Sequence, residues 1–433
     1  MAVFPPNCWA RNHDLDSAFY AEGLEKLALR ILLLNEYFPP DTSATAKMAS
    51  LVANALAERH EVTVLAGRPS YDPDERYPFA FLRREQCDRI CVERVGSTDY
   101  SRHQMRKRVA NYLSYSTLAF PRALSLDVDL VLAMTDPPFA GILGATVARM
   151  KRVPFVYNIR DLYPDMAVGG DIVRPRTWVR FWERLHRAAL RQATRVIVLG
   201  EDMRDRIVAK GVDPHHAAVV RDGISLPAPE ADPNHPAIRE IRGTGEFVVL
   251  HAGNLGFYGA WPTLLDAARI LPENGIRFVF VGDGANRNNL QQSSQDCPIV
   301  RFLPFRPANE IPCVLAAGDV HVVTIRRGLN GVIVPSKMYS ILAAGRPVLA
   351  VAPEDTDVSR IVRREGCGLV VDPDKPADVA AAVQLLKNDP ALVATMGQRA
   401  REAARQFSRA GELNKFVNVV EEAAHISHSQ RPA

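Results

Sequence analysis

Two series of short apolar runs, each alternating with stretches of helical periodicity, constrain this fold more than any other feature. In the first half, apolar runs at residues 31–34, 61–66, 130–134, 155–159 and 195–199 enclose helical patterns at 43–58, 139–150 and 176–193. Buried strands that alternate with helices predict a parallel sheet with crossover connections. A second series has runs at 247–250, 278–281, 300–303, 320–324, 348–351 and 369–371. The sequence therefore predicts two doubly wound, Rossmann-like α/β domains.

The boundary between the two series is a stretch rich in proline, acidic residues and glycine. Residues 226–244 include PAPEADPNHP, which is typical of an exposed linker. A chain of 433 residues also exceeds the size at which one hydrophobic core stops growing. We expect residues 1–28 to be an N-terminal extension, 29–225 the first domain, 245–408 the second, and 409–433 a helix and tail. Ligands of such sheets bind at the carboxyl ends of the strands, so we expect the site in the cleft between the domains.

Composition and charge limit the possible partners. The chain is 47% hydrophobic and 24% charged, and its formal charge of +4 comes without a lysine-rich tail, so nothing predicts a nucleic-acid partner. Six cysteines without any C-x2-C pair favour neither a zinc site nor a disulfide framework, as in a reducing cytoplasm. The sequence shows neither a signal peptide nor an apolar run of membrane-spanning length, so any contact with a membrane is expected to be peripheral.

Residues 331–352 read as a loop, a short helix, a glycine stop and a buried strand. Pro335 suits the first helical turn, Gly345 suits a left-handed position after the helix, and Ser336 and Lys337 lie at the helix start. A positive dipole end, a hydroxyl and an ammonium together suit a phosphate oxygen. The alternative interpretation is a capped helix with a solvated lysine.

This segment, GVIVPSKMYSILAAGRPVLAVA, resembles the donor site of family-4 glycosyltransferases, which are retaining enzymes of the GT-B fold. The resemblance covers nearly everything after residue 30 and points to the O-antigen and exopolysaccharide branch, such as the N-acetylfucosamine transferases. It also implies that the C-terminal helix crosses back to the first domain. The family carries an E-x7-E pair here, whereas this chain has Val332 and Ser340 at the two glutamate positions. Ser336, Lys337 and Ser340 are left as the polar groups for the same task.

The resemblance implies further donor contacts. Ser43 stands where the family has a glycine pair near the donor phosphates, although Ser43 or Thr45 is also expected to cap a helix. The loop with Gly253, Asn254 and Gly256 lacks the two cations that grip the diphosphate in the family, but its backbone N–H groups remain. The missing positive charge is then expected from Arg326, Arg327 and Lys337, and the residues expected beside the donor base are Phe305 and Arg306.

On the acceptor side, Arg160 and Asp161 follow the strand at 155–159, where the family often carries His-Asp. Arginine stays protonated in proteins, so Arg160 cannot act as a base, but it can bind phosphate charge. Asp161 could accept the proton of an acceptor hydroxyl or hold the donor sugar. The alternative is that Asp161 merely pairs with Arg160. Asp136, before a Pro-Pro pair, is interpreted as a helix cap and turn residue.

Several D-x-D pairs could suggest a metal site. Each lies in a turn or before a strand, so we interpret all of them as solvated turns and expect neither a metal nor a cofactor. The pairs are Asp14/Asp16, Asp72/Asp74, Asp127/Asp129, Asp355/Asp357 and Asp372/Asp374.

Two basic segments are candidates for membrane contact. Arg102, Arg106, Lys107 and Arg108 open an amphipathic run, which we expect to dock at the inner face of the plasma membrane. The arginine-rich stretch at 176–195 contains Trp178, Phe181 and Trp182, and we interpret it as the outer face of a helix that packs on the sheet.

The resemblance implies transfer of a sugar from a nucleoside diphosphate donor, most simply a UDP-sugar, to a lipid-linked or polysaccharide acceptor with retention, in bacterial cell-surface glycan synthesis. A nicotinamide-dependent oxidoreductase would need G-x-G-x-x-G after a first strand, and no glycine follows Leu34 there. An epimerase or hydrolase of nucleotide sugars, and a binding protein that has lost catalysis, remain as alternatives.

Overall fold

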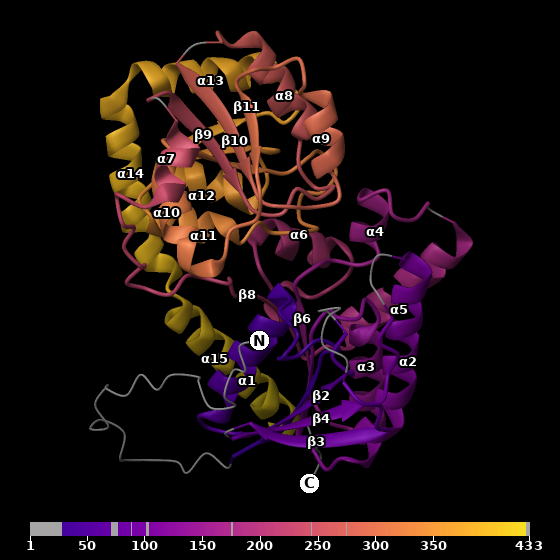
Figure 1. Ribbon diagram of the computed structural model, residues 1–433. Helices are drawn as coiled ribbons and strands as arrows, with labels where there is room; N and C mark the ends of the chain where they lie inside the picture. The colour runs from indigo at the N-terminus through magenta and orange to yellow at the C-terminus, as the bar shows by residue number, and fades with distance from the viewer. Residues whose placement is uncertain are drawn as a thin grey trace, which may run out of the picture.

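The computed structural model describes residues 28–70, 77–87, 89–100, 104–174, 176–243, 245–273 and 275–429. It contains two domains built on parallel sheets, one above the other in Figure 1. The predicted fold class is therefore confirmed. The expected N-terminal extension lies outside the described residues, except for Ala28.

The sheet of the first domain has eight strands in the order β3-β4-β2-β1-β5-β6-β7-β8. All neighbours pair in parallel except β3 and β4, which are antiparallel. The strands are β1 (Arg30–Leu34), β2 (Glu61–Ala66), β3 (Leu82–Cys87), β4 (Ile90–Val95), β5 (Leu130–Ala133), β6 (Phe155–Ile159), β7 (Arg195–Val198) and β8 (Ala217–Val219). Apart from β3, β4 and β8, these are the strands that the apolar runs predicted.

Helices cover both faces of this sheet. On one side, α3 contacts both α2 and α5, so the three helices lie side by side, and α1 lies on the opposite side (Figure 1). Ser43 caps α1 by accepting a hydrogen bond from the N–H of Ala46 at 3.0 Å, as predicted. The helices are α1 (Ala44–Ala57), α2 (Met105–Ser125), α3 (Ala140–Lys151), α4 (Asp165–Gly169), α5 (Thr177–Gln192) and α6 (Glu201–Ala209).

The second domain has a parallel sheet of six strands in the order β11-β10-β9-β12-β13-β14. Its strands are β9 (Phe247–Ala252), β10 (Ile276–Val281), β11 (Val300–Leu303), β12 (Val320–Thr324), β13 (Val348–Val351) and β14 (Gly368–Val371). Its helices are α7 (Pro236–Arg242), α8 (Trp261–Ile270), α9 (Arg287–Ser293), α10 (Ile311–Ala317), α11 (Lys337–Ala343), α12 (Asp357–Glu365), α13 (Pro376–Asn388) and α14 (Pro390–Ala404).

Part of the stretch expected to be linker is ordered within the second domain. Helix α7 lies inside residues 226–244, and its Ile241 is fully buried with Val248 and Val314. The proline at its first position starts the helix where the composition suggested only a loop. The connection between the domains is therefore shorter than the sequence indicated.

The C-terminal helix α15 (Arg409–Ser429) returns to the first domain, as the resemblance implied (Figure 1). Its Phe416, Val417 and Val420 are buried in one cluster with Val52 and Val62 of the first domain. The last helix thus joins the two domains on the side opposite α2, α3 and α5.

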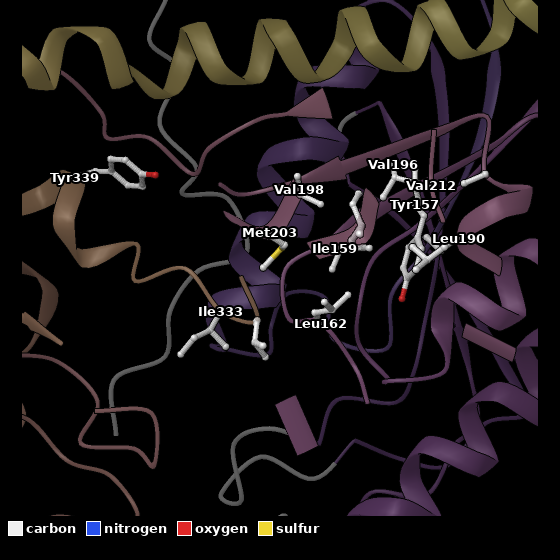
Figure 2. Packing of buried hydrophobic residues seen from close by; sticks show 14 of the residues in the cluster. Tyr157, Ile159, Leu162, Leu190, Val196, Val198, Met203, Val212, Ile333 and Tyr339 are labelled. Carbon is white, nitrogen blue, oxygen red and sulfur yellow. The ribbon is translucent and has the colours of Figure 1, made fainter. Parts of the chain in front are cut away.

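The two domains also share a hydrophobic cluster where they meet. Figure 2 shows Leu162 and Met203 of the first domain with Ile333 and Tyr339 of the second, and all four are buried in the same cluster. The N–H of Leu162 donates to the carbonyl of Val332 at 3.0 Å. This contact fixes the loop after β6 against the loop that leads into α11.

Charged groups strengthen the same junction. Arg221 binds Asp357 with N–O distances of 2.8 and 3.2 Å. Asp202 accepts from the N–H of Gly331 at 3.1 Å, and Arg206 donates to the carbonyl of Asn330 at 3.0 Å. The junction is therefore polar as well as apolar, and it fixes how the two halves of the cleft face each other.

We predict that Val332→Glu, which restores the residue type of the family, destabilises this chain by about 3 kcal/mol or more, because Val332 is fully buried in the shared cluster. Urea unfolding followed by circular dichroism measures the change. Val332→Ala separates the loss of packing, worth about 1 to 2 kcal/mol, from the burial of a charge. Equal stability of the glutamate variant and the wild type would contradict this prediction.

Candidate active site

Three carboxyl side chains follow three neighbouring strands of the first sheet. Glu36 follows β1, Asp136 follows β5 and Asp161 follows β6, and these strands are adjacent. The N–H of Glu36 donates to the carbonyl of Asp136 at 2.7 Å, which joins the first two loops. Asp136 and Asp161 are half-buried, whereas Glu36 is 1% exposed. The carboxyl ends of these strands thus form an acidic edge at the cleft.

The surroundings of Asp161 suit proton transfer. Burial, followed by the negative charge of Asp136, raises the pKa of Asp161 to about 6. Asp222 acts in the same direction, while Arg160 and Arg108 oppose the shift. A carboxyl group whose pKa lies near neutrality can accept and release protons under ordinary conditions.

Arg160 does not pair with Asp161. Its guanidinium binds both carboxylate oxygens of Asp222 at 2.7 Å, so the alternative interpretation of an Arg160–Asp161 pair is wrong. Arg160 also lines a small cavity together with Glu412 and Phe416 of α15. Contact of Arg160 with a substrate phosphate, as the sequence predicted, would have to compete with this ion pair.

Arg108 was expected at a membrane surface, and the structure corrects that prediction. Its guanidinium donates to the hydroxyl of Tyr112 and lies 5.4 Å from the centre of that ring. It is near enough to Glu36 and Asp161 to oppose the rise of their pKa. Tyr112 follows Arg108 by one helical turn and is buried, so both side chains point toward the domain.

The carboxyl group of Glu36 is buried without a hydrogen bond among the described residues. Neither of its carboxylate oxygens has a partner within the part of the chain that the structure describes. Burial, then the charges of Asp136 and Asp41, raise the pKa of Glu36 well above its usual range, which favours the neutral acid. The sequence analysis did not single out this residue, although its place directly after a buried strand was a signal.

Across the cleft, Lys337 lies against the glycine loop that follows β9. Its ammonium nitrogen is 2.9 Å from Nδ1 and 3.2 Å from Nε2 of the buried His251. A Cβ placed on Gly253 would lie 3.7 Å from Cδ of Lys337, so the lysine runs along this loop. Lys337 is therefore positioned to meet an anion bound at the loop.

The charge of Lys337 is not balanced locally. Among the described residues, no carboxylate lies within ion-pair distance of its ammonium group. Burial lowers the pKa of Lys337 to about 7, and burial together with Lys337 lowers the pKa of His251 well below its usual range. An anionic ligand would supply the charge that this lysine lacks.

The glycine loop itself is tightly folded. Gly253 has φ of 141°, and its carbonyl would lie 2.1 Å from a Cβ on Gly282, so both positions require glycine. The N–H of Gly253 donates to Val281 and that of Leu255 to Asp283. The N–H groups between Gly253 and Gly256 were predicted to be available to a ligand, but those of Gly253 and Leu255 already donate within the protein.

Helix α11 differs from its prediction in one respect. Gly345 adopts the expected left-handed conformation, with φ of 64°. Ser336 occupies the cap position but its side chain makes no capping hydrogen bond, and the helix has only seven residues. Pro335 and Ser340 are half-buried beside it. The side chain of Lys337, and not the helix start, is therefore the distinctive feature of this segment.

The arginines predicted to replace the missing cations have partners of their own. Arg326 donates to the carbonyl of Gly169 and to Asp171, at 2.8 Å for the latter, and so joins the second domain to α4. Arg327 binds Asp372 at 2.7 Å and Asp374 at 2.5 Å. Lys337 thus differs from both, since their charges are already balanced.

The predicted base-binding residues lie after β11. Phe305 is 72% exposed, so its ring is free to stack on a planar group. Arg306 forms ion pairs with Glu240 at 2.5 Å and with Glu310 at 3.6 Å. Its charge is therefore already balanced by these two carboxylates. The donor contact predicted for Ser43 is constrained in the same way by its capping bond to α1.

The D-x-D pairs within the described residues serve other purposes. Asp127 and Asp129 bind Arg30, and Asp372 and Asp374 bind Arg327. Asp14/Asp16 and Asp72/Asp74 lie outside the described residues. In the described parts of the chain, no three His, Cys, Asp or Glu side chains are grouped so that they could hold a metal ion. The predicted absence of a metal stays a prediction.

Comparison with known proteins identifies the family of both domains. Residues 44–223 match a glycosyl transferase 4-like domain, and residues 236–403 match the glycosyl transferases group 1 domain. The probable glycosyltransferase WbjE of Pseudomonas aeruginosa is 27% identical over 301 residues, or 67% of this chain and 74% of WbjE. The putative colanic acid biosynthesis glycosyl transferase WcaI of Escherichia coli K12 is 21% identical over 408 residues, or 90% of this chain and 99% of WcaI.

Solved structures share the two-domain arrangement. HepE of Anabaena, in complex with UDP, superposes with a TM-score of 0.64 at 17% identity and covers 91% of this chain and 100% of HepE. WaaG, a glycosyltransferase involved in lipopolysaccharide biosynthesis, gives a TM-score of 0.63 at 16% identity over 90% of this chain and 99% of WaaG. The two matching domains and this shared architecture show that the chain belongs to the glycosyltransferases of the GT-B fold.

Proposed function

We propose that this glycosyltransferase moves a sugar from a UDP-sugar to a lipid-linked or polysaccharide acceptor, with retention, in the synthesis of a bacterial cell-surface glycan. The observation that carries the proposal is Lys337, a half-buried lysine beside the glycine loop whose ammonium has no carboxylate partner among the described residues. Two comparisons support it, because HepE was solved with UDP and with UDP-glucose and WcaI is named for colanic acid biosynthesis.

The second domain binds the diphosphate of the donor. As the glycosidic bond breaks, negative charge grows on the leaving diphosphate, and the ammonium of Lys337 stabilises it. Electrostatic stabilisation of the charge that develops in the transition state is usually the largest single contribution to catalysis. Phe305 is available to stack on the base of the donor.

The first domain positions the acceptor, and Asp161 accepts the proton of the attacking hydroxyl. The bond between Leu162 and Val332 holds the loop of Asp161 against the loop that precedes Lys337. Asp165 is a poorer base, since Lys210 and Arg206 overcome the effect of burial and hold its pKa below the usual range. The branch of N-acetylfucosamine transferases stays our prediction for the kind of sugar transferred.

The enzyme is also proposed to dock on the inner face of the plasma membrane through two helices. Met105, Val109 and Leu113 are exposed on α2, and Trp178 and Phe181 are exposed on α5 at 48% and 61%. Both helices contact α3, so they lie on one side of the domain (Figure 1).

Exposed cations accompany these apolar side chains. They are Arg106 and Lys107 on α2, and Arg176, Arg180 and Arg184 at α5. An apolar face edged by cations suits an anionic bilayer. Helix α5, which the sequence interpretation set aside, thus contributes the larger side chains, while Arg108 points inward and Arg102 lies outside the described residues. None of the helices in the described part of the chain is long and apolar enough to span a bilayer.

One assay separates the proposed function from its alternatives. Purified protein is incubated with a panel of UDP-sugars, with and without octyl glycosides that mimic the end of a glycan chain. Transfer gives a disaccharide product only with acceptor. An epimerase or hydrolase would consume the donor alone, and a binding protein that has lost catalysis would bind UDP without turnover.

We predict that UDP binding at about pH 8 takes up a proton, because the pKa of Lys337 is about 7 in the free protein and the diphosphate raises it. Calorimetry in buffers of different ionisation enthalpy measures this uptake. Lys337→Met should abolish it and weaken UDP binding by about 1.5 to 3 kcal/mol. Lys337→Arg should keep affinity without uptake, and the exposed Lys375→Met is the control. Undiminished proton uptake in Lys337→Met would remove Lys337 from the site.

We predict that Asp161→Asn lowers turnover by roughly a hundredfold or more and leaves UDP affinity intact, because the residue lies on the acceptor side. In the wild type, turnover should fall as the pH drops below the pKa of Asp161, about 6, since the protonated acid cannot accept a proton. A pH–rate profile checks both points. Wild-type turnover in Asp161→Asn would instead assign the proton to a phosphate oxygen of the donor.

We predict that Trp178→Ser together with Phe181→Ser reduces binding to anionic vesicles by roughly tenfold or more, through loss of apolar contact area. Flotation with phosphatidylglycerol vesicles, at low and high salt, gives the measurement. The matched control is Phe79→Ser with Phe81→Ser, since both rings are exposed but belong to the segment before β3 and not to α2 or α5. Equal flotation of both double variants would rule out this surface.

A further inference from the structure

A group of polar side chains beside Asp161 has no part in donor binding as proposed above. It consists of Glu36 and Asp136 after β1 and β5, and of Arg108 and Tyr112 from α2. Asp136, Arg108 and Asp161 are half-buried, while Glu36 and Tyr112 are buried. The group therefore has an accessible rim of charges above a buried carboxyl.

Glu36 indicates that a ligand completes this group. Buried carboxyl groups in folded proteins are nearly always hydrogen-bonded, yet both oxygens of Glu36 lack a partner among the described residues. The side chain lies near Asp136 and Arg108, which both act on its pKa. A buried, unpaired acid that faces a charged rim is costly for folding alone, so its retention points to a function.

The positively charged Arg108 also indicates that a ligand completes this group. A guanidinium has five N–H donors, and the hydroxyl of Tyr112 is the side-chain acceptor that the structure shows for it. Within the described residues, Arg108 forms no ion pair, although it is near enough to Glu36 and Asp161 to lower the pKa of each. Donors therefore remain for a ligand between these acids.

The chemistry of the rim selects a class of ligand. An anion would be repelled by Asp161, and an apolar group would leave the carboxyl of Glu36 and the remaining N–H donors of Arg108 without hydrogen bonds. A sugar ring has several hydroxyl groups, each of which both donates and accepts. Carboxylates can accept from such hydroxyls while a guanidinium donates to them.

We propose that Asp136, Asp161, Arg108 and Tyr112, with Glu36 beneath them, form the subsite for the terminal, uncharged sugar ring of the acceptor. The proposal rests on the proposed function and specifies which end of the acceptor the first domain recognises. Asp136 and Asp161 accept from ring hydroxyls, Arg108 donates, and Glu36 stays protonated and pairs with a hydroxyl or a water brought by the ring.

Asp136 has a second effect, as a positioning residue. The groups that face Asp161 are Asp136, Arg160, Asp222, Arg108 and Tyr163. Of these, Asp136 contributes most to the raised pKa of Asp161 after burial. Asp136→Asn should therefore move the acidic limb of the pH–rate profile to lower pH as well as raise the KM for acceptor. A purely structural role would not shift that limb.

The test uses the full chain, a UDP-sugar that supports turnover, and octyl glycosides as the acceptor probe. Arg108→Gln should raise the acceptor KM by roughly tenfold or more and leave UDP affinity unchanged, and Arg108→Lys should show a smaller effect. Arg301→Gln, which removes an exposed charge of the second domain, is the control. Glu36→Leu should raise both the acceptor KM and the melting temperature of the ligand-free protein, because it removes an unpaired buried acid.

Two results would overturn the proposal of this acceptor subsite. One is an unchanged acceptor KM in Arg108→Gln, Arg108→Lys and Glu36→Leu. The other is the absence of transfer to every octyl glycoside while UDP still binds, since a single ring should fill the subsite. If the wild-type protein did not bind UDP, the proposed function itself would be wrong. The melting temperature of each variant shows that a raised KM does not come from unfolding.

Discussion

The hydrogen bond from Leu162 to Val332, within the apolar cluster that both domains share, is the contact on which the rest of the site depends. Asp161 precedes one end of this bond, and Lys337 follows the other by a short loop. The two chemical groups are far apart in the sequence and lie in different sheets, so neither domain alone could set their relation. Packing of Met203, Ile333 and Tyr339 around the bond keeps water out of the junction and holds the two loops together.

Burial then acts on the two sides of the cleft in opposite directions. It lowers the pKa of Lys337 to about 7 and raises the pKa of Asp161 to about 6, because loss of water penalises whichever form is charged. A cation without a counterion on one side suits a diphosphate. Acids gathered around Arg108 on the other side suit a neutral ligand rich in hydroxyls. This difference in charge is why we propose that the second domain binds the donor and the first domain the acceptor.

The sequence predicted the fold well wherever apolar runs were buried on both faces, as in β1, β6 and β13. It missed β3, whose residues LRREQC are mostly exposed at the edge of the sheet and show no apolar alternation. It singled out Asp161 from its place after a strand and from the resemblance, but it could not show that Asp136 acts on Asp161 or that Asp222 holds Arg160. Those relations depend on which strands become neighbours, and a single sequence does not specify that order.

A finer reading of helical spacing would have corrected one error. Arg106, Lys107 and Arg108 look equivalent as a basic run, yet Arg108 lies one turn before the buried Tyr112 and near the buried Tyr115 on the same face.

On the donor side, the differences between this chain and its family balance each other in charge. This chain lacks both the glutamate pair and the two cations that its family carries there, so the missing charges cancel. With Val332 apolar and Ser340 neutral, no acid among the described residues neutralises Lys337, so its single charge is available for the donor phosphates that we propose it binds.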